Sequence, residues 1–307
     1  MRRKLIVGSR GSKLAMIQTE SVVAKIREEN PDLEVSISKI VTKGDRNRRT
    51  QLDRMTGIGV FVKEIEEALL DSRIDIAVHS LKDVPTETPQ ELCLLAVTER
   101  LDPRDVLVSR TGRLDQLPPG SKIGTSSLRR AVQLARYRPD LEASGIRGNI
   151  DTRLRKVFSG EFDGVILAAA AILRLGWEDR ISEYLPTEPF LPAVGQGVLV
   201  IEARLDDEEV AELVSPINDL PTWQSITAER TFLSALGGGC RTPIAALGTV
   251  NDNTLKLEGM VADVSGQKVL YASEEGSAMS PQEIGAQLAQ KMLSMGASEF
   301  ITEVRSR

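Results

Sequence analysis

Residues 74–85 read IDIAVHSLKDVP, and this stretch decides the fold class. Isoleucine or valine at every second position gives the period of a β-strand. Pro85 disfavours a helical backbone at the residue before it, so a rigid, extended turn should follow the strand. The turn carries Lys82 and Asp83. An aspartate at the carboxyl end of a strand can stabilise a cation or transfer a proton, or it can be an ordinary loop residue bonded to backbone N–H groups.

Strand and helix patterns alternate on both sides of this stretch. Residues 5–7 predict a buried strand, and Ser12 is expected to cap the helix that follows. A strand at 35–41 and a helix at 61–69 come next, and a similar series runs from 106 to 201. This βαβ order predicts an α/β fold with a largely parallel sheet and helices on its faces.

The pattern changes near the end of the chain. Three strand-like stretches at 244–250, 255–264 and 268–273 are joined by short turns, and a helix follows from Ser280. Short connections join antiparallel neighbours. We therefore expect a smaller α+β domain with a three-stranded antiparallel sheet.

Length and charge narrow the possible functions. With 307 residues, the chain is long enough for two or three domains. A net charge of −5 lacks the basic surplus of a nucleic-acid binder. The apolar run at 5–7 is too short for a secretory signal, and no stretch is long and apolar enough to span a bilayer. We expect a cytoplasmic protein with neither nucleic acid nor membrane as a partner.

Histidine and cysteine are scarce. One histidine, His79, and two distant cysteines fit no familiar zinc spacing and no disulfide framework, so no metal is expected. His79 and Cys93 lie among apolar residues and are expected to be structural. Cys240 instead follows three glycines in GGGCRTP, after a helix that Thr222 is expected to cap. The arginine after Cys240 favours the thiolate, which suits covalent attachment or nucleophilic attack.

Arginines recur at the starts of helices that follow predicted strands. A cation there is unfavourable by roughly 0.3–1 kcal/mol, so several of them together indicate bound anions. Solvated surface arginines are the alternative. Planar guanidinium groups suit carboxylates, and the motifs that would favour a nucleotide are missing. The arginines are Arg10, Arg129, Arg130, Arg147 and Arg153.

Six segments, taken in order, resemble the porphobilinogen deaminase (hydroxymethylbilane synthase) family over nearly the whole chain. Together they are far more specific than any one alone. They are VGSRGSKLA (7–15), AVHSLKDVP (77–85), GTSSLRR (124–130), IRGNIDTRL (146–154), PAVGQG (192–197) and LGGGCRTP (236–243).

The resemblance implies a fold of two domains shaped like type II periplasmic binding proteins, with mixed, mostly parallel sheets. A smaller C-terminal α+β domain with a three-stranded antiparallel sheet completes it. The implied domains are 1–98 with 198–216, 102–192, and 219–307.

The resemblance also implies a cytoplasmic transferase of tetrapyrrole biosynthesis that is a monomer. It would join four porphobilinogen molecules head to tail on a dipyrromethane cofactor, held through a thioether to Cys240, with Asp83 as the catalytic carboxylate. Implied cofactor-binding residues are Lys82, Asp83, Ser127, Arg129, Arg130 and Arg147. Implied substrate-binding residues are Arg10, Ser12, Ser80, Thr125, Arg147, Arg153, Arg174 and Gln196.

The sequence departs from the family pattern at two places. The motif GIGV at 57–60 lacks the lysine that the family usually has between the glycines, and Asp151 adds a negative charge between Arg147 and Arg153. Two alternatives stay open. One is a cytoplasmic anion-binding module on the same fold. The other is a cysteine-nucleophile enzyme of another class, for which His79 is the one histidine available as a base.

Overall fold

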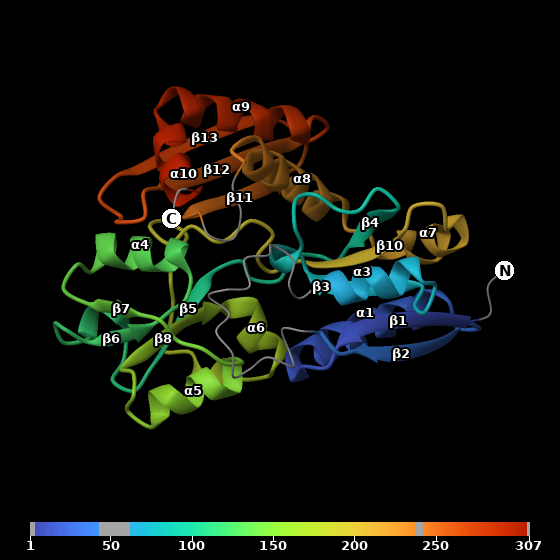
Figure 1. Cartoon of the computed structure of the whole chain (residues 1–307), viewed down its shortest axis with the longest axis horizontal. Coiled ribbons are helices and arrows are strands. Elements are labelled where there is room, and N and C mark those ends of the chain that lie inside the picture. The colour runs from blue at the N-terminus through green and yellow to red at the C-terminus, as the bar shows by residue number, and fades with distance from the viewer. Residues whose placement is uncertain (1–3, 43–61, 238–241, 306–307) are drawn as a thin grey trace. The chain divides into compact units, whose positions relative to one another are not determined.

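The computed structural model describes residues 4–42, 62–237 and 242–305, with the side chains of 302–305 left out (Figure 1). The chain forms two compact units. Unit 1 consists of Met1–Leu101 and Val198–Trp223, and unit 2 consists of Asp102–Gly197 and Gln224–Arg307. The three-domain division at 1–98 with 198–216, 102–192 and 219–307 stays a prediction.

Unit 1 is built on a five-stranded sheet in the order β2-β1-β3-β10-β4. The first three strands are parallel, whereas β10 runs antiparallel to both of its neighbours. Four of the five strands therefore share one direction, as predicted. The strands are β1 (Lys4–Arg10), β2 (Glu34–Ile40), β3 (Ile76–Ser80), β4 (Leu92–Val97) and β10 (Leu199–Arg204).

Apolar helix faces cover both sides of this sheet because alternate strand residues point to opposite faces. Val22 and Ile26 of α1 (Lys13–Glu29) lie in one cluster with residues of α7 (Glu208–Val214). On the other face, α3 (Lys63–Leu70) buries apolar side chains against the sheet.

Unit 2 contains a second five-stranded sheet, in the order β7-β6-β8-β5-β9. Here β7, β6 and β8 are parallel and β5 runs antiparallel to β8 and β9, which repeats the arrangement in unit 1. Helices α5 and α6 cover one face and α4 the other. The elements are β5 (Asp105–Ser109), β6 (Lys122–Gly124), β7 (Glu142–Ser144), β8 (Gly164–Ala168), β9 (Glu183–Tyr184), α4 (Leu128–Tyr137), α5 (Ile150–Phe158) and α6 (Ala169–Arg174).

The C-terminal part of unit 2 is the predicted three-stranded antiparallel sheet, in the order β11-β12-β13. One face packs against α8, α9 and α10. On the other face, Val132 of α4 packs among apolar residues of β11 and β12. The strands are β11 (Ile244–Asn251), β12 (Thr254–Ala262) and β13 (Val269–Ser277), and the last two helices are α9 (Pro281–Ser294) and α10 (Ala297–Arg305). Helix α8 (Leu220–Ala235) begins in unit 1 and continues into unit 2 from Gln224.

The start of α8 corrects one expectation. The helix begins at Leu220, and the Asp219 side chain accepts a hydrogen bond of 3.0 Å from the Thr222 N–H. Thr222 instead lies within the helix, and its hydroxyl accepts from the Arg100 N–H. The prediction of Thr222 as the cap is wrong because the helix begins earlier, and Asp219 takes the capping position directly before Leu220.

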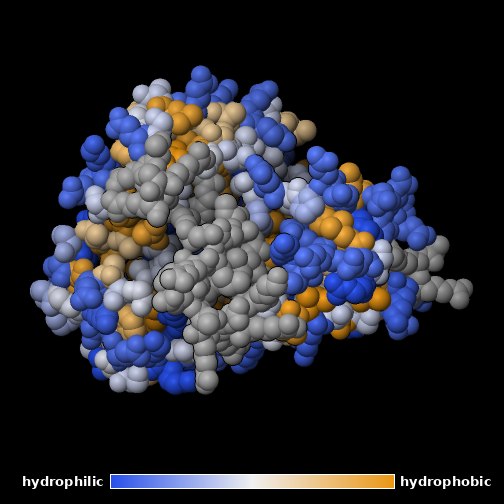
Figure 2. Space-filling model, viewed as in Figure 1, coloured by the Kyte–Doolittle hydropathy of each residue, from blue (hydrophilic) through white to orange (hydrophobic). Residues whose placement is uncertain are grey.

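On the face shown in Figure 2, polar side chains predominate and apolar ones are scattered among them. The exposed apolar residues of the described chain include Leu205 and Met279. Within the described residues, no helix is long and apolar enough to cross a membrane.

Candidate functional site

In unit 1, two predicted site residues lie at one edge of the sheet. Strands β1 and β3 are parallel neighbours, with Val7 opposite Ile76. Arg10 is the last residue of β1, and Ser80 is the last residue of β3. The Ser80 hydroxyl accepts a hydrogen bond of 2.9 Å from Gln18 Nε2. Arg10 and Ser80 are therefore brought to the edge where open α/β sheets bind ligands.

Asp83 ends a single 3-10 turn, η2 (Leu81–Asp83), which follows β3 directly. Leu81 and Val84 are buried on either side of it. Val84 has the extended backbone that the following proline predicts. The Asp83 side chain is exposed, and the described part of the chain provides no hydrogen bond or ion pair to it, while Lys82 beside it is half-buried. The buried side chains of Leu81 and Val84 thus hold the turn in place and leave the Asp83 carboxylate accessible.

In unit 2, Arg129 and Arg130 converge on a buried carboxylate that the sequence analysis missed. Arg129 Nη1 lies 2.9 Å from Asp105 Oδ2, and Arg130 Nη2 lies 2.7 Å from Asp105 Oδ1. All three side chains are buried, with Asp105 fully inaccessible. Each arginine also donates to a carbonyl, Arg129 to Leu191 at 2.7 Å and Arg130 to Ile166 at 3.1 Å.

The electrostatics of this group follow from its burial. Burial alone would raise the pKa of Asp105, but the charges of Arg129 and Arg130 and their hydrogen bonds hold it well below its usual range. Asp105 is therefore ionised and neutralises one of two guanidinium charges. A positive charge remains in a region shielded from water.

The start of α4 places both arginines. Ser127 caps the helix, and its hydroxyl accepts from the Arg130 N–H at 3.5 Å. Thr125 is buried, and its hydroxyl accepts from the Ser127 N–H at 3.2 Å. Arg129 and Arg130 thus occupy the first turn, as predicted. Ser12 caps α1 in the same way in unit 1, accepting from the Ala15 N–H at 3.2 Å.

A third arginine belongs to this electrostatic group. Asn149 caps α5, and Arg153 in the first turn donates from Nε to the Gly148 carbonyl at 2.9 Å. Burial and the positive charge of Arg130 both lower the pKa of Arg153. Arg147, in the turn before Asn149, is exposed.

The PAVGQG segment contains Gln196, and Arg174 forms a hydrogen bond to it. Arg174 Nη2 donates to the Gly197 carbonyl at 2.9 Å, and burial lowers the pKa of Arg174 to about 10, so it stays charged at neutral pH. Gln196 is buried, and its Nε2 donates to Asp105 Oδ1 at 2.8 Å and to the Pro103 carbonyl at 2.7 Å. Gln196 is thus linked to the arginine pair through Asp105.

Cys240 lies outside the described residues, as does the 57–60 motif, so the structure places neither. The structure does describe His79 and Cys93. His79 Nε2 lies 3.1 Å from Glu202 Oε2, and both side chains are buried. Cys93, on β4, is half-buried, and burial together with the negative charge of Glu202 raises its pKa. Neither residue has the exposure of a reactive group.

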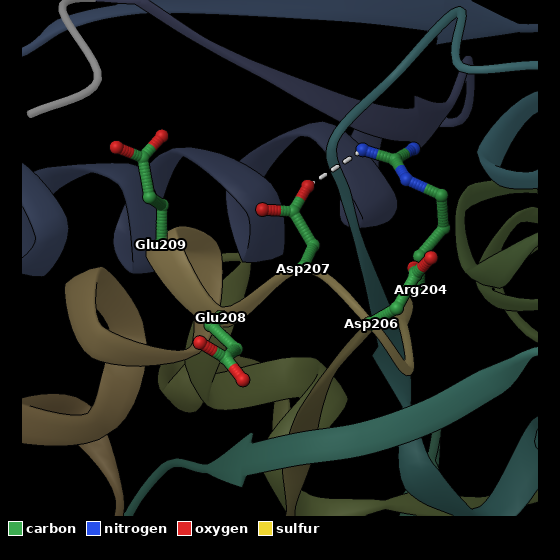
Figure 3. A pocket seen from close by; sticks show the side chains of 5 residues that line it. All are labelled: Arg204, Asp206, Asp207, Glu208 and Glu209. Atoms are coloured by element: carbon green, nitrogen blue, oxygen red, sulfur yellow. Dashed lines mark hydrogen bonds and ion pairs between the residues drawn. The ribbon is translucent and has the colours of Figure 1, made fainter.

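A hollow of about 420 Å³ lies at the end of β10 (Figure 3). It contains none of the predicted site residues. Arg204 Nη2 pairs with Asp207 at 2.8 Å, and Asp207 caps α7. Its remaining lining residues are Asp206, Glu208 and Glu209. Local structure thus accounts for Asp207, and we do not assign the hollow a catalytic role.

Comparisons with known proteins bear on both units. Residues 5–212 match the family model described as "Porphobilinogen deaminase, dipyromethane cofactor binding domain", and residues 223–294 match "Porphobilinogen deaminase, C-terminal domain".

The chain belongs to the porphobilinogen deaminase family. Curated relatives with this name include one from Brevibacillus brevis, 48% identical over 97% of this chain and 96% of its own length. Another, from Deinococcus radiodurans, is 48% identical over 99% of both chains. A third, from Desulforamulus reducens, is 45% identical over all of this chain and 99% of its own.

As a member of the porphobilinogen deaminase family, the chain is an enzyme of tetrapyrrole synthesis, and 5–212 is its dipyrromethane cofactor binding domain. Asp83, Arg129 and Arg130 all lie in that segment. Among solved structures, the methionine binding protein MetQ matches with a TM-score of 0.43 and 14% identity, over 73% of this chain and 91% of its own. The periplasmic VFT2 domain of Bordetella pertussis BvgS matches with a TM-score of 0.41 and 14% identity, over 69% and 86%.

Proposed function

We propose that this chain joins four porphobilinogen molecules head to tail on a dipyrromethane bound through a thioether to Cys240. Each addition forms one carbon–carbon bond, breaks one carbon–nitrogen bond and releases ammonia. Hydrolysis then frees hydroxymethylbilane, which makes the enzyme a transferase. The observation that supports this most is the surplus positive charge of Arg129 and Arg130 over Asp105, because porphobilinogen carries two carboxylates.

The residues of unit 2 fit a carboxylate-bearing cofactor. Buried cations are costly unless they are paired. Arg130 Nε is buried and has no hydrogen-bond partner among the described residues. A guanidinium with an unused N–H and a neighbouring surplus charge is suited to a carboxylate, with which it makes charge-assisted hydrogen bonds. We propose that Arg129, Arg130, Arg147, Ser127 and Lys82 hold the dipyrromethane.

When bound, the dipyrromethane would supply the pyrrole to which porphobilinogen is added. We propose that Asp83 assists the loss of ammonia from the aminomethyl group and stabilises the positive charge that develops on the pyrrole. An exposed carboxylate without a partner among the described residues is available for this purpose. Anchoring the growing chain makes each addition effectively intramolecular.

Carboxylates of the incoming porphobilinogen need cations and hydroxyls of their own. Arg10 and Ser80 share one edge of the unit 1 sheet, while Arg153 and Arg174 are partly buried cations of unit 2. We propose that the substrate is bound by Arg10, Ser12, Ser80, Thr125, Arg147, Arg153, Arg174 and Gln196. Of these, Gln196 already donates to Asp105, so we expect its substitution to disturb Arg129 and Arg130 as well as substrate binding.

We also propose that the enzyme is a cytoplasmic monomer. The anion-binding module that the sequence left open is disfavoured, because the relatives with matching length are named as the enzyme.

The intact mass of the denatured protein tests the proposal directly. We expect an adduct equal to two porphobilinogens less two ammonias, which is absent in Cys240→Ser. Cys93→Ser is the matched control and should keep the adduct. An unmodified wild-type mass that persists after incubation with porphobilinogen would refute covalent attachment and favour the alternative of an anion-binding module.

A further inference from the structure

Asp105 has no role in the proposed chemistry, yet it is the group that holds the arginine pair. It is the first residue of β5 and pairs in register with Ala168, the last residue of β8. Its Oδ1 accepts from both Arg130 Nη2 and Gln196 Nε2, while its Oδ2 faces Arg129 Nη1. The carboxylate therefore contacts three side chains that the sequence analysis assigned to ligand binding.

The geometry fixes the direction of each guanidinium. Arg129 Nη1 is held between Asp105 Oδ2 and the Leu191 carbonyl, and Arg130 is held between Asp105 Oδ1 and the Ile166 carbonyl. A long side chain fixed at one end by its backbone and at the other by a carbonyl and an ion pair with a carboxylate has few rotamers left. Such a group need not reorganise when a ligand binds, which favours affinity.

The net charge of the group formed by Arg129, Arg130 and Asp105 is the second feature that Asp105 controls, besides the orientation of the guanidinium groups. Two guanidinium groups and one carboxylate leave a charge of +1, and Arg153 adds a further cation close enough for Arg130 to lower its pKa. Without Asp105, the two adjacent buried guanidinium groups would repel each other, which disfavours their present alignment.

We propose that Asp105 is a positioning residue, which aligns Arg129 and Arg130 and reduces their joint charge to that of one carboxylate-binding group. This inference rests on the proposed role of the two arginines in binding the carboxylates of the dipyrromethane. Each porphobilinogen is joined to that group, so a misplaced dipyrromethane also changes KM for porphobilinogen. In this proposal Asp105 acts through the two arginines and does not itself bind substrate or cofactor.

Two substitutions separate alignment from charge. Asp105→Glu keeps the charge and lengthens the side chain by one methylene, whereas Asp105→Asn keeps the shape and removes the charge. The matched control is Asp163→Asn. Asp163 directly precedes β8, at the opposite end of that strand from Ala168, and pairs with Arg110 at 3.2 Å.

KM and kcat for porphobilinogen would be measured on the holoenzyme across a salt series from about 0.05 to 0.5 M, where screening becomes strong. We expect Asp105→Glu to raise KM about fivefold at every salt concentration, with kcat within twofold and the salt dependence unchanged; this KM change corresponds to roughly 1 kcal/mol. We expect Asp105→Asn to raise KM and to steepen its salt dependence. Asp163→Asn should match wild type.

A purely structural carboxylate would lower the folded fraction without changing KM or its salt dependence. Asp105→Glu with wild-type KM would overturn the inference, and so would folded Asp105→Asn with wild-type KM and salt dependence. If Asp105→Asn does not fold, the KM of Asp105→Glu tests the inference alone. Arg129→Gln and Arg130→Gln show which proposal fails. If both arginine variants keep the wild-type KM and cofactor content, the proposed role of the arginines is refuted. If the arginine variants raise KM and the Asp105 variants do not, only the role of Asp105 is refuted.

Discussion

The Oε2 atom of Glu229, on α8, accepts a hydrogen bond of 2.7 Å from the backbone N–H of Gly195, in the segment that precedes β10. Its Oε1 accepts from the Gly248 N–H of β11 at 2.8 Å. Glu229 is fully buried. One carboxylate thus joins the PAVGQG segment, which carries Gln196, to the helix and sheet of the C-terminal part of unit 2.

Glu229→Gln should destabilise the fold. A glutamine can accept one of the two backbone N–H groups, but its own NH₂ then faces the other. We expect the free energy of unfolding to fall by about 1–3 kcal/mol, the cost of an unsatisfied buried donor. Urea unfolding followed by circular dichroism measures this. Glu275→Gln, at an exposed position of β13, is the control. Equal midpoints for the two variants would contradict the expected role.

Asp83→Asn should abolish most of the activity while leaving the fold intact. The exposed carboxylate makes no contact within the described residues that an amide would break. We expect kcat to fall by about 10²–10⁴, the usual range for a positioned acid or base. Steady-state kinetics measure this, with intact mass to confirm the cofactor. Glu87→Gln, exposed in the same loop region, should retain wild-type kcat. Retention of activity by Asp83→Asn would assign catalysis elsewhere.

His79→Gln distinguishes a structural histidine from a catalytic base. His79 Nε2 lies 3.1 Å from Glu202 Oε2, and both side chains are buried. Losing this contact leaves a buried carboxylate poorly satisfied, so we expect unfolding to become easier by about 1–3 kcal/mol. KM and kcat should stay within twofold of wild type. A loss of kcat at full folding would instead favour the cysteine-nucleophile alternative.

Acid should weaken the fold through Asp105. Its carboxyl pKa is lower in the folded than in the unfolded chain, so its stabilisation is complete above the unfolded value of about 3.9 and is lost as pH falls towards the folded value. Across that window the contribution changes by roughly 1.4 kcal/mol per pH unit. We expect the stability difference between wild type and Asp105→Asn to stay constant above about pH 4 and to shrink as the pH falls below it. Urea unfolding at each pH measures this difference in the free energy of unfolding. A difference that does not change with pH would show that the arginines do not lower the pKa of Asp105 in the folded protein.

Gly148→Ala should disturb the start of α5. Gly148 has a φ of 112°, and an added Cβ would lie 2.6 Å from Thr152 Cγ2. Its carbonyl also accepts from Arg153. We expect a loss of about 1–3 kcal/mol in stability from the strained backbone, together with a higher KM. Gly145→Ala, where the added Cβ meets nothing within 4 Å, is the control and should change neither.

Local features of the site were predictable from sequence. Pro85 fixed the extended backbone before it, and Ser12 caps its helix because a hydroxyl at that position reaches an exposed N–H group. The first-turn positions of Arg129 and Arg130 followed from a strand, a short polar turn and a helical stripe. These inferences need only neighbours within a few residues.

Contacts between distant segments were not predictable in this way. Asp105 lies 25 residues before Arg130 and 91 before Gln196, and nothing in the sequence links them. Asp105 is an acid at the start of a buried strand, and this was the one signal for a partner of opposite charge. The similarity of the two sheets was expected, but the place of the antiparallel strand in each sheet was not, because it depends on pairing between segments far apart in the chain.

The antiparallel β10 has a consequence for how the chain is made. It lies between β3 and β4 and pairs with both. β3 can already pair with β1, but β4 cannot join the sheet before β10 is present. Roughly 100 residues separate β4 from β10, which a ribosome adds in about 5–20 s. During that interval the nascent chain exposes apolar strand surface with no partner, while residues 102–197 emerge. Synthesis of unit 1 thus begins first, but its sheet is completed only after the central sheet of unit 2 has left the ribosome.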